Sequence, residues 1–140
     1  MTVSPDERWL AYASNESGRF EVYVRPFPGV SSGRWQASLS GGRAPRWAPS
    51  GRELFFRNLT NDLVAVPISQ GVSLTLGERR ILFHLDGFPP NPMQVAYEVG
   101  PDGRFLYLRQ IGPGNSGPST PVILVQNWLV EVRARMKGQR

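Results

Sequence analysis

A chain of 140 residues with 40% apolar and 19% charged side chains is long enough for one globular domain with a core and too short for two ordinary domains. It has no run of about eighteen apolar residues and no basic, apolar leader at its start, so we expect neither a membrane span nor an intact signal peptide. Cysteine is absent, which excludes disulfides, thiolate metal sites and a cysteine nucleophile, and leaves the cellular compartment open.

The formal net charge of +5 is concentrated at the C-terminal end of the chain. Residues 128–140 contain four basic residues and one acidic residue, whereas residues 1–127 contain 12 basic and 10 acidic residues. A nucleic-acid-binding surface would gather lysine and arginine on the folded body of the protein. We therefore expect no nucleic-acid partner and interpret residues 128–140 as a solvated basic end.

The 15 glycines and 13 prolines would favour disorder unless they recur with a period, and they do recur. The segments 3–12, 47–56 and 99–108 align without gaps and share Pro, Arg and Leu at the same offsets. Their prolines lie 44 and 52 residues apart along the chain. A repeat of about 40 to 45 residues with several strands is typical of a β-propeller blade.

Each repeated segment predicts a tight turn, because Pro fixes φ at one central position and Asp, Ser and Gly tolerate the next ones. Apolar and aromatic runs on both sides of the turns predict strands, and strand alternation should turn Leu54 and Phe56 towards the blade interfaces. The predicted strands are, in chain order, 9–14, 20–25, 34–39, 44–48, 53–57, 63–68, 79–84, 94–99, 105–109 and 121–126.

When the strands of a blade are lettered A to D from the inside outwards, the chain reads B, C, D, then A, B, C, D, then A, B, C, with residues 1–3 as a stub of the first A strand. This order gives a partial blade over 1–40, a full blade over 41–85 and a partial blade over 86–127. A short helix should follow from Asn127, and we expect its apolar side to pack on the propeller rim rather than bind a partner. The predicted fold is thus all-β, a β-propeller segment of about three four-stranded antiparallel blades with a short C-terminal helix.

These repeats, most clearly residues 45–56 (PRWAPSGRELFF), resemble the WD40-like (PD40) repeat of TolB-like β-propellers. The stretches EVYVRPFPG, GGRAPRW and VQNW are also similar to the C-terminal propeller of bacterial serine/threonine protein kinases. The chain departs from the pattern at Glu7, which replaces Gly, at Ser50, which replaces Asp, and at Gly100, which replaces Ser. The resemblance implies a sensor or scaffold role in a bacterial protein, and it allows a periplasmic or other extracytoplasmic location.

Blade geometry also predicts where a binding site should lie. The A-to-B and C-to-D turns share one face of a blade array, and the B-to-C loops share the other face with the D-to-A connections. Long loops on a rigid scaffold are where binding residues usually occur, although such loops also serve as slack connectors. From this face we choose Arg43, Arg46, Phe88 and Asn91 as candidate ligand-binding residues.

No motif in the chain predicts catalysis, a cofactor or a metal site. Residues 29–33 match GxSxG around Ser31, but no strand precedes them and no helix follows, so we predict an ordinary turn. Residues 112–117 match GxGxxG, but proline-rich sequence follows where a dinucleotide site needs a helix. His84 is the single histidine, and one histidine without cysteine does not make a zinc site.

The favoured interpretation is a non-catalytic recognition or scaffold module that binds a protein or peptide. The alternatives are the propeller portion of a prolyl-oligopeptidase-like hydrolase and a propeller that binds a small ligand. Closed propellers have about four to eight blades, so about three blades leave bare faces that favour self-association. We expect a two-fold, head-to-tail dimer that completes a six-bladed ring, unless the chain is a fragment whose parent supplies the missing blades.

Overall fold

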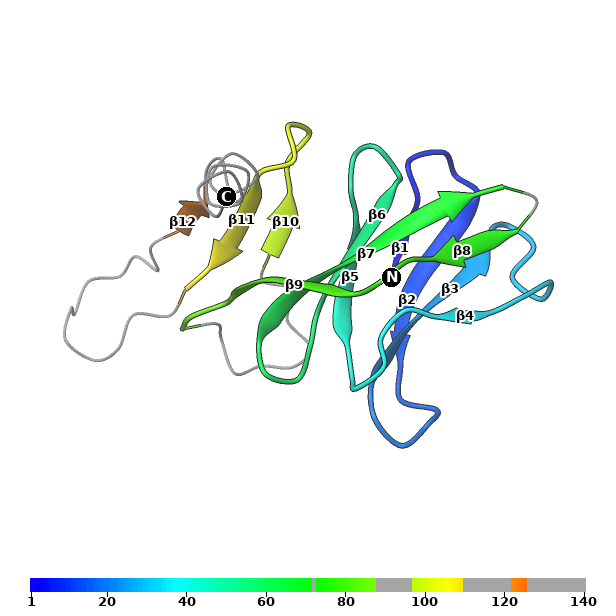
Figure 1. Cartoon of the computed structure of the whole chain (residues 1–140), viewed down its shortest axis with the longest axis horizontal. Coiled ribbons are helices and arrows are strands. Elements are labelled where there is room, and N and C mark those ends of the chain that lie inside the picture. The colour runs from blue at the N-terminus through cyan, green and yellow to red at the C-terminus, as the bar shows by residue number, and fades with distance from the viewer. Residues whose placement is uncertain (72, 88–96, 110–121, 126–140) are drawn as a thin grey trace, which may run out of the picture.

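The computed structural model describes residues 1–71, 73–87 and 97–109, together with the backbone of residues 122–125. All regular structure in these residues is β-strand (Figure 1). Within the described ranges there is no helix of the length and hydropathy that a membrane span needs. The strands are β1 (Thr2–Val3), β2 (Trp9–Ser14), β3 (Glu21–Pro26), β4 (Trp35–Gln36), β5 (Arg43–Trp47), β6 (Glu53–Arg57), β7 (Asp62–Gln70), β8 (Leu74–Leu76), β9 (Arg80–His84), β10 (Tyr97–Val99), β11 (Phe105–Leu108) and β12 (Val122–Val125).

The strands form three antiparallel sheets, each from consecutive parts of the chain. The first sheet has the order β1-β2-β3-β4, the second has β5-β6-β7 extended by β8 and β9, and the third has β10-β11-β12. Every predicted strand overlaps a strand of the structure, and β1 supplies the predicted stub of the first A strand. Strand β8 was not predicted; it exists because β7 runs on to Gln70 and its extra length pairs with residues 74–76. The predicted helix from Asn127 lies outside the described residues.

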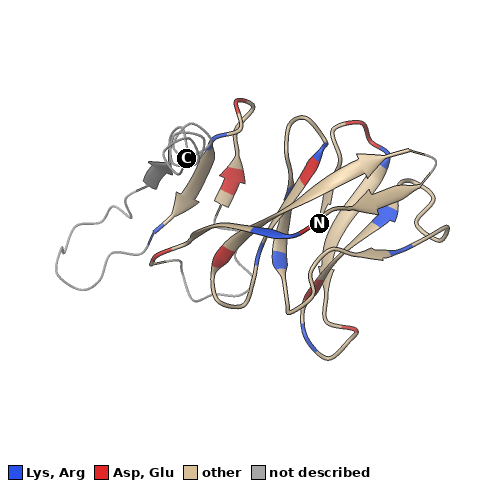
Figure 2. Cartoon of the chain, in the orientation of Figure 1, with Lys and Arg blue, Asp and Glu red and all other residues tan. Residues whose placement is uncertain are grey.

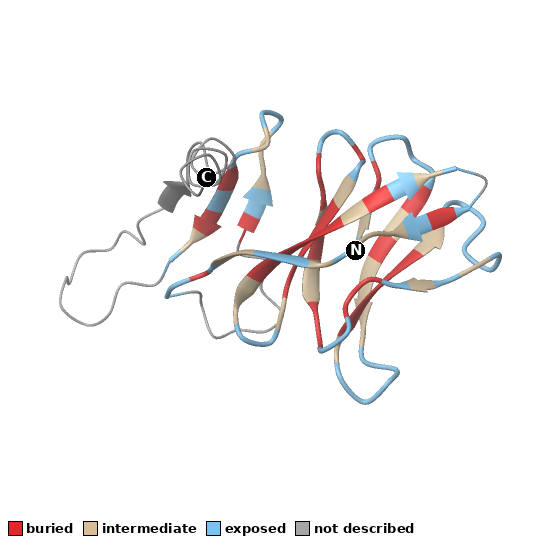
Figure 3. Cartoon of the chain, viewed as in Figure 1, coloured by how far each residue is buried: buried red, intermediate tan, exposed pale blue. Residues whose placement is uncertain are grey.

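The sheets stack face to face, so the second sheet is covered on both sides (Figure 3). Leu54 and Phe56 pack on Trp9 of the first sheet, while Phe55 packs on Phe105 of the third sheet. Successive residues of a strand point to opposite faces, so a strand between two sheets must be apolar at every position. This explains the unbroken apolar runs of β6 and β7, and it confirms the predicted burial of Leu54 and Phe56 at a sheet interface.

The three predicted turns have the same backbone conformation in all three repeats. In turns 4–7, 48–51 and 100–103 the amide of the fourth residue donates to the carbonyl of the first, with N···O distances of 2.9 Å in each case. The fourth residue is left-handed in every turn, with φ of 58° at Glu7, 68° at Gly51 and 78° at Gly103. Glu7 therefore keeps the turn that glycine makes in the other repeats.

The third hairpin differs from the first two in its register. The amide of Ala48 donates to the carbonyl of Glu53 at 2.9 Å, five residues on, whereas Gly100 donates to Arg104 at 2.7 Å, four residues on. A one-residue change in register moves every side chain of the strand to the opposite face. As a result Leu106, the counterpart of Leu54, faces away from the second sheet and is 38% exposed.

Candidate functional site

Those of the grouped loops that the structure describes do lie on one face of the molecule, the lower edge in Figure 1. The Gly42 amide donates to the Phe20 carbonyl at 2.8 Å, and the Leu85 amide donates to the Asn61 carbonyl at 2.8 Å. We call residues 15–20, 38–43, 58–62 and 85 the loop face. The three tight turns lie at the opposite edge of the sheets, which we call the turn face.

A buried carboxylate organises the loop face. Glu21, at the start of β3, is almost fully buried and accepts hydrogen bonds from the Gly41 amide at 3.0 Å and from Arg19 Nε at 2.6 Å. The Ser38 hydroxyl also donates to it. Burial alone would raise the pKa of Glu21, but the hydrogen bonds from Ser38, Arg19 and Gly41 outweigh burial and lower it. Glu21 thus ties the β4–β5 connection to the loop that precedes β3.

Arg43, a predicted site residue, is the first residue of β5 and belongs to the loop face. Its guanidinium carbon lies 4.1 Å from the ring centroid of Phe20, a cation–π contact that holds the side chain across two loops. Arg57 is its cross-strand partner on β6 and donates through Nη1 to Asn61 Oδ1 at 2.9 Å. Burial and, to a smaller extent, the charge of Arg43 on the paired strand lower the pKa of Arg57. Sequence reasoning missed Arg57, although a charge at the end of a wholly apolar strand was a signal.

Arg46 lies near the other end of β5, beyond a β-bulge that separates it from Arg43. Its Nε is 3.0 Å from Glu98 Oε2 on β10, and the neighbouring Tyr97 hydroxyl donates to the Ala44 carbonyl at 2.5 Å. Burial raises the pKa of the Tyr97 hydroxyl, which keeps it a proton donor in this contact. The structure therefore places Arg46 in the joint between the second and third sheets, apart from Arg43.

The other two predicted site residues, Phe88 and Asn91, lie outside the described residues. Their positions relative to Arg43 and Arg46 therefore stay a prediction.

Two exposed leucines complete the loop face. Leu39 is 63% exposed and Leu59 is 55% exposed, and they come from different loops. Leu59 lies against Gly41, where a Cβ atom would come within 2.4 Å of the leucine side chain. Arg19 Nη2 donates to the Leu39 carbonyl at 2.9 Å, so an arginine adjoins this leucine as well. Sequence reasoning missed both leucines, because a leucine in a polar loop does not reveal whether it is buried.

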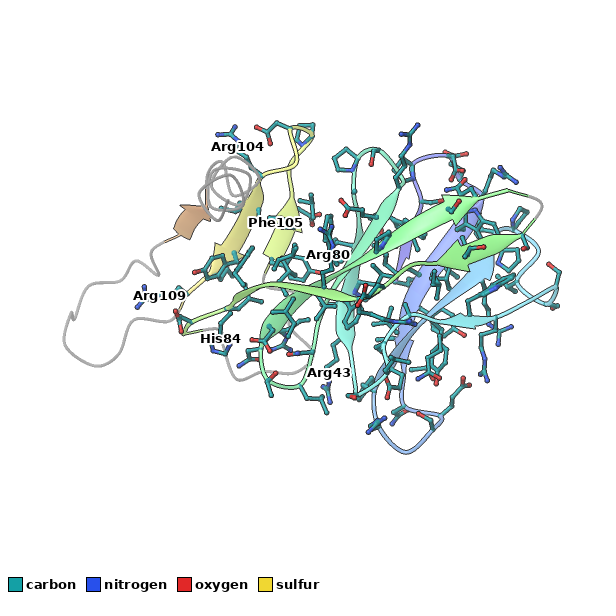
Figure 4. All side chains as sticks on the ribbon, viewed as in Figure 1. Arg43, Arg80, His84, Arg104, Phe105 and Arg109 are labelled. Atoms are coloured by element: carbon teal, nitrogen blue, oxygen red, sulfur yellow. The ribbon has the colours of Figure 1, made fainter. Side chains whose placement is uncertain are left out.

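His84 lies in a polar cluster at the end of β9 (Figure 4). Its Nδ1 is 2.8 Å from Asp62 Oδ1, and Asp62 also accepts from the Thr60 hydroxyl at 2.6 Å and from Asn58 Nδ2 at 3.0 Å. These hydrogen bonds, that of Thr60 foremost, lower the pKa of Asp62 to about 2. In the part of the chain that the structure describes, no group of three His, Cys, Asp or Glu residues is arranged to hold a metal ion.

Ser31 lies in the loop that joins β3 to β4, as predicted for an ordinary turn. The residues after it lead into β4 rather than a helix, so the strand–turn–helix context of a nucleophile elbow is missing around it.

The fold is similar to that of a solved protein. Oligogalacturonate lyase from Vibrio parahaemolyticus, a seven-bladed β-propeller, aligns with a TM-score of 0.56 and 13% sequence identity. The alignment covers 76% of this chain and 27% of the lyase, so the chain spans about a quarter of that protein. No family model and no curated protein matches the sequence. At this identity the likeness concerns the fold alone: the described part of the chain is all-β, with antiparallel sheets in a propeller-like arrangement.

Proposed function

We propose that this chain is a non-catalytic recognition module that binds a protein or peptide partner through the loop face. The observation that carries the proposal is the pair of exposed leucines, Leu39 and Leu59, on a loop face that also carries Arg19, which donates to the Leu39 carbonyl, and Arg43. Apolar side chains in the centre of a patch with arginine around them are typical of protein–protein interfaces.

The framework under these leucines is tied together by hydrogen bonds and a cation–π contact, which favours binding. Glu21 fixes the β4–β5 connection through Ser38 and Gly41, and Phe20 holds Arg43 in place. A surface that is ordered before binding loses less conformational entropy when the partner arrives. For this reason we propose that the partner binds at the loop face rather than at a loop without such hydrogen bonds.

The WD40-like character of the repeats belongs to the proposal as well. The three equivalent turns, each with a left-handed fourth residue, support a repeated hairpin unit of the TolB-like type. The non-catalytic assignment is supported by His84, because both of its ring nitrogens face carboxylates: Nδ1 lies 2.8 Å from Asp62 Oδ1 and Nε2, which would face the nucleophile in a catalytic triad, lies 3.8 Å from Asp86 Oδ1. A propeller that screens a hydrolase active site stays the alternative.

Selection of a phage-displayed random peptide library against the purified, immobilised chain tests the proposal that the loop face binds a peptide. Peptides selected on the wild-type chain should bind at least about tenfold more weakly to Leu39→Asp and Leu59→Asp, because a carboxylate in an apolar contact costs more than about 1.4 kcal/mol. Ile81→Asp, an equally exposed apolar position on β9, serves as the matched control and should bind as the wild type does. Peptides whose affinity is the same for all four proteins would show that the partner binds elsewhere.

We also propose that two copies of the chain associate head to tail. Leu54 is fully buried because the first sheet covers it, whereas its repeat counterparts Leu10 and Leu106 lie on the outward faces of the two end sheets. The outward face of the first sheet carries Arg25 on β3 and that of the third carries Glu98 on β10, the blue end of β3 and the red segment of β10 in Figure 2. Stacking one face on the other would bury apolar surface and would bring Arg25 near Glu98, whose carboxylate already contacts Arg46 of its own chain.

A further inference from the structure

A groove opens on the turn face between the second and third sheets. It has a volume of about 320 Å³ and lies between turn 48–51, turn 100–103 and strand β9. Arg80 and Phe105, both labelled in Figure 4, are among the residues that border it. The loop-face proposal makes no use of this groove, which lies at the other edge of the sheets.

The walls of the groove are mainly apolar. Phe55 and Phe105 meet edge to face, with ring centroids 4.9 Å apart and an interplanar angle of 86°. Ile81 and Val99 also line the groove, and Ile81 is 66% exposed. An apolar group seated here would remove Ile81 from water, which is favourable in proportion to the area covered, and would rest on the rings of Phe55 and Phe105, which are themselves buried.

The register of the third hairpin creates the aromatic wall. With the register of the first two hairpins, Leu106 would face the second sheet and Phe105 would point away from it. The shorter connection at Gly100 turns Phe105 towards Phe55 instead. The groove is therefore a property of this pair of sheets and not of the repeat in general.

A cation stands at the rim of the apolar walls. Arg80 Nη2 lies 3.0 Å from Glu53 Oε1, and the two side chains are 60% and 33% exposed. A guanidinium has five N–H donors in a fork that matches a carboxylate, and this contact engages one of them. An exposed ion pair of this kind is weak, so an incoming carboxylate competes with Glu53 on nearly equal terms.

We propose that the groove binds a small free carboxylic acid with an aromatic or branched apolar tail. The tail lies against Phe55, Phe105 and Ile81, and the carboxylate lies on Arg80. The volume is at the small end of the range for small-molecule sites, about 300 to 1,000 Å³, which favours a free acid over a folded partner. Nothing in this proposal depends on the loop face.

Titration of the ¹⁵N-labelled chain with 4-phenylbutyrate and with the neutral 4-phenylbutanol tests the proposal. The acid should shift the amide resonances of residues 48–53, 80–82 and 99–105, and it should bind at least about threefold more tightly than the alcohol, as expected for one exposed charge pair. The absence of shifts in these segments, or equal affinities for acid and alcohol, would overturn the proposal.

Three variants sharpen the result. Arg80→Gln should reduce the affinity for the acid to that for the alcohol, and Glu53→Gln should raise the affinity for the acid about twofold, because Arg80 then has no competing carboxylate. Ile81→Asp should weaken both ligands. Leu59→Asp on the loop face is the matched control and should leave both affinities unchanged, so failure here and failure of the loop-face proposal are separable. An Arg80→Gln chain that unfolds at the wild-type temperature and binds the acid as tightly as the wild type would refute the assigned role.

Discussion

At the scale of single residues, Glu7 shows how a turn keeps its shape with an unfavourable side chain. Its φ of 58° is in the left-handed region, which costs a residue other than glycine about 1 to 2 kcal/mol. The side chain is exposed and sits where Gly51 and Gly103 stand in the other repeats. The conformation is imposed by the hairpin, because the Glu7 amide still donates to the Ser4 carbonyl at 2.9 Å.

Glu7→Gly should therefore stabilise the protein by about 0.5 to 1 kcal/mol, since relief of the strained φ exceeds the extra entropy of glycine in the unfolded chain. Gly51→Ala is the converse change and should cost about 1 kcal/mol, because φ is 68° while the new Cβ atom would clear Pro5 at 3.7 Å. Urea unfolding of both variants measures the two effects. A loss of stability in Glu7→Gly would mean that the first turn is not left-handed at this residue.

Glu21 should make stability depend on pH in the acidic range. Its pKa in the folded protein lies below the ordinary value of 4.5, so its contribution is present above that pH and is lost as the pH falls through the lower, folded-state value. Glu21→Gln should cost about 1.5 to 3 kcal/mol at pH 7, the usual range for hydrogen bonds to a charged group. Below pH 4.5 the difference between variant and wild type should shrink. Unfolding free energies measured from pH 7 to pH 3 check this, and a difference that stays constant over the range would contradict it.

At the scale of strands and hairpins, local sequence located the elements but did not set every register. Pro, Gly and the apolar runs between them determine where β2, β6 and β11 lie, because turn chemistry and strand preference are local properties. The one-residue difference of the third hairpin is not evident from its turn residues: turns 48–51 and 100–103 both have Pro in second place and Gly in fourth. Packing of Phe105 on Phe55 distinguishes the two registers, and that contact joins residues far apart in the sequence.

The candidate site was also predictable only as far as local sequence and strand order determine it. Strand order alone brought Arg43 to the loop face, because alternate ends of antiparallel strands lie at the same edge of a sheet. It could not show that a β-bulge separates Arg46 from Arg43, or that Arg57 adjoins Arg43. The exposure of Leu39 and Leu59 depends on how the loops pack, which the residue types do not encode one by one.

A pair of equivalent substitutions tests the register of the third hairpin. Leu54→Ala should cost about 2 to 5 kcal/mol, the usual range for a buried leucine, because the side chain is fully buried between two sheets. Leu106→Ala should cost less than about 1 kcal/mol when the chain is dilute enough to be monomeric, because its side chain faces outwards. Chemical denaturation gives both values. Equal costs would mean that the third hairpin has the register of the other two.

At the scale of the whole molecule, the second sheet is complete and the end sheets are not. Clusters of buried residues cover both of its faces, from Trp9 and Val24 on one side and from Phe105 and Tyr107 on the other. The first and third sheets each pack on one face only among the described residues. Basic and acidic residues are interspersed over all three sheets, so opposite charges are available where two chains would meet (Figure 2).

Light scattering across a size-exclusion peak, at micromolar concentration, tests most directly whether this arc of sheets is completed by a second copy. The wild-type protein should form a single species with twice the chain mass of 15.6 kDa, and Leu106→Asp should reduce this to the mass of one chain. The substitution acts because it places a charge on the apolar outward face of the third sheet. A monodisperse wild-type species of 15.6 kDa that unfolds cooperatively would rule out the proposed dimer.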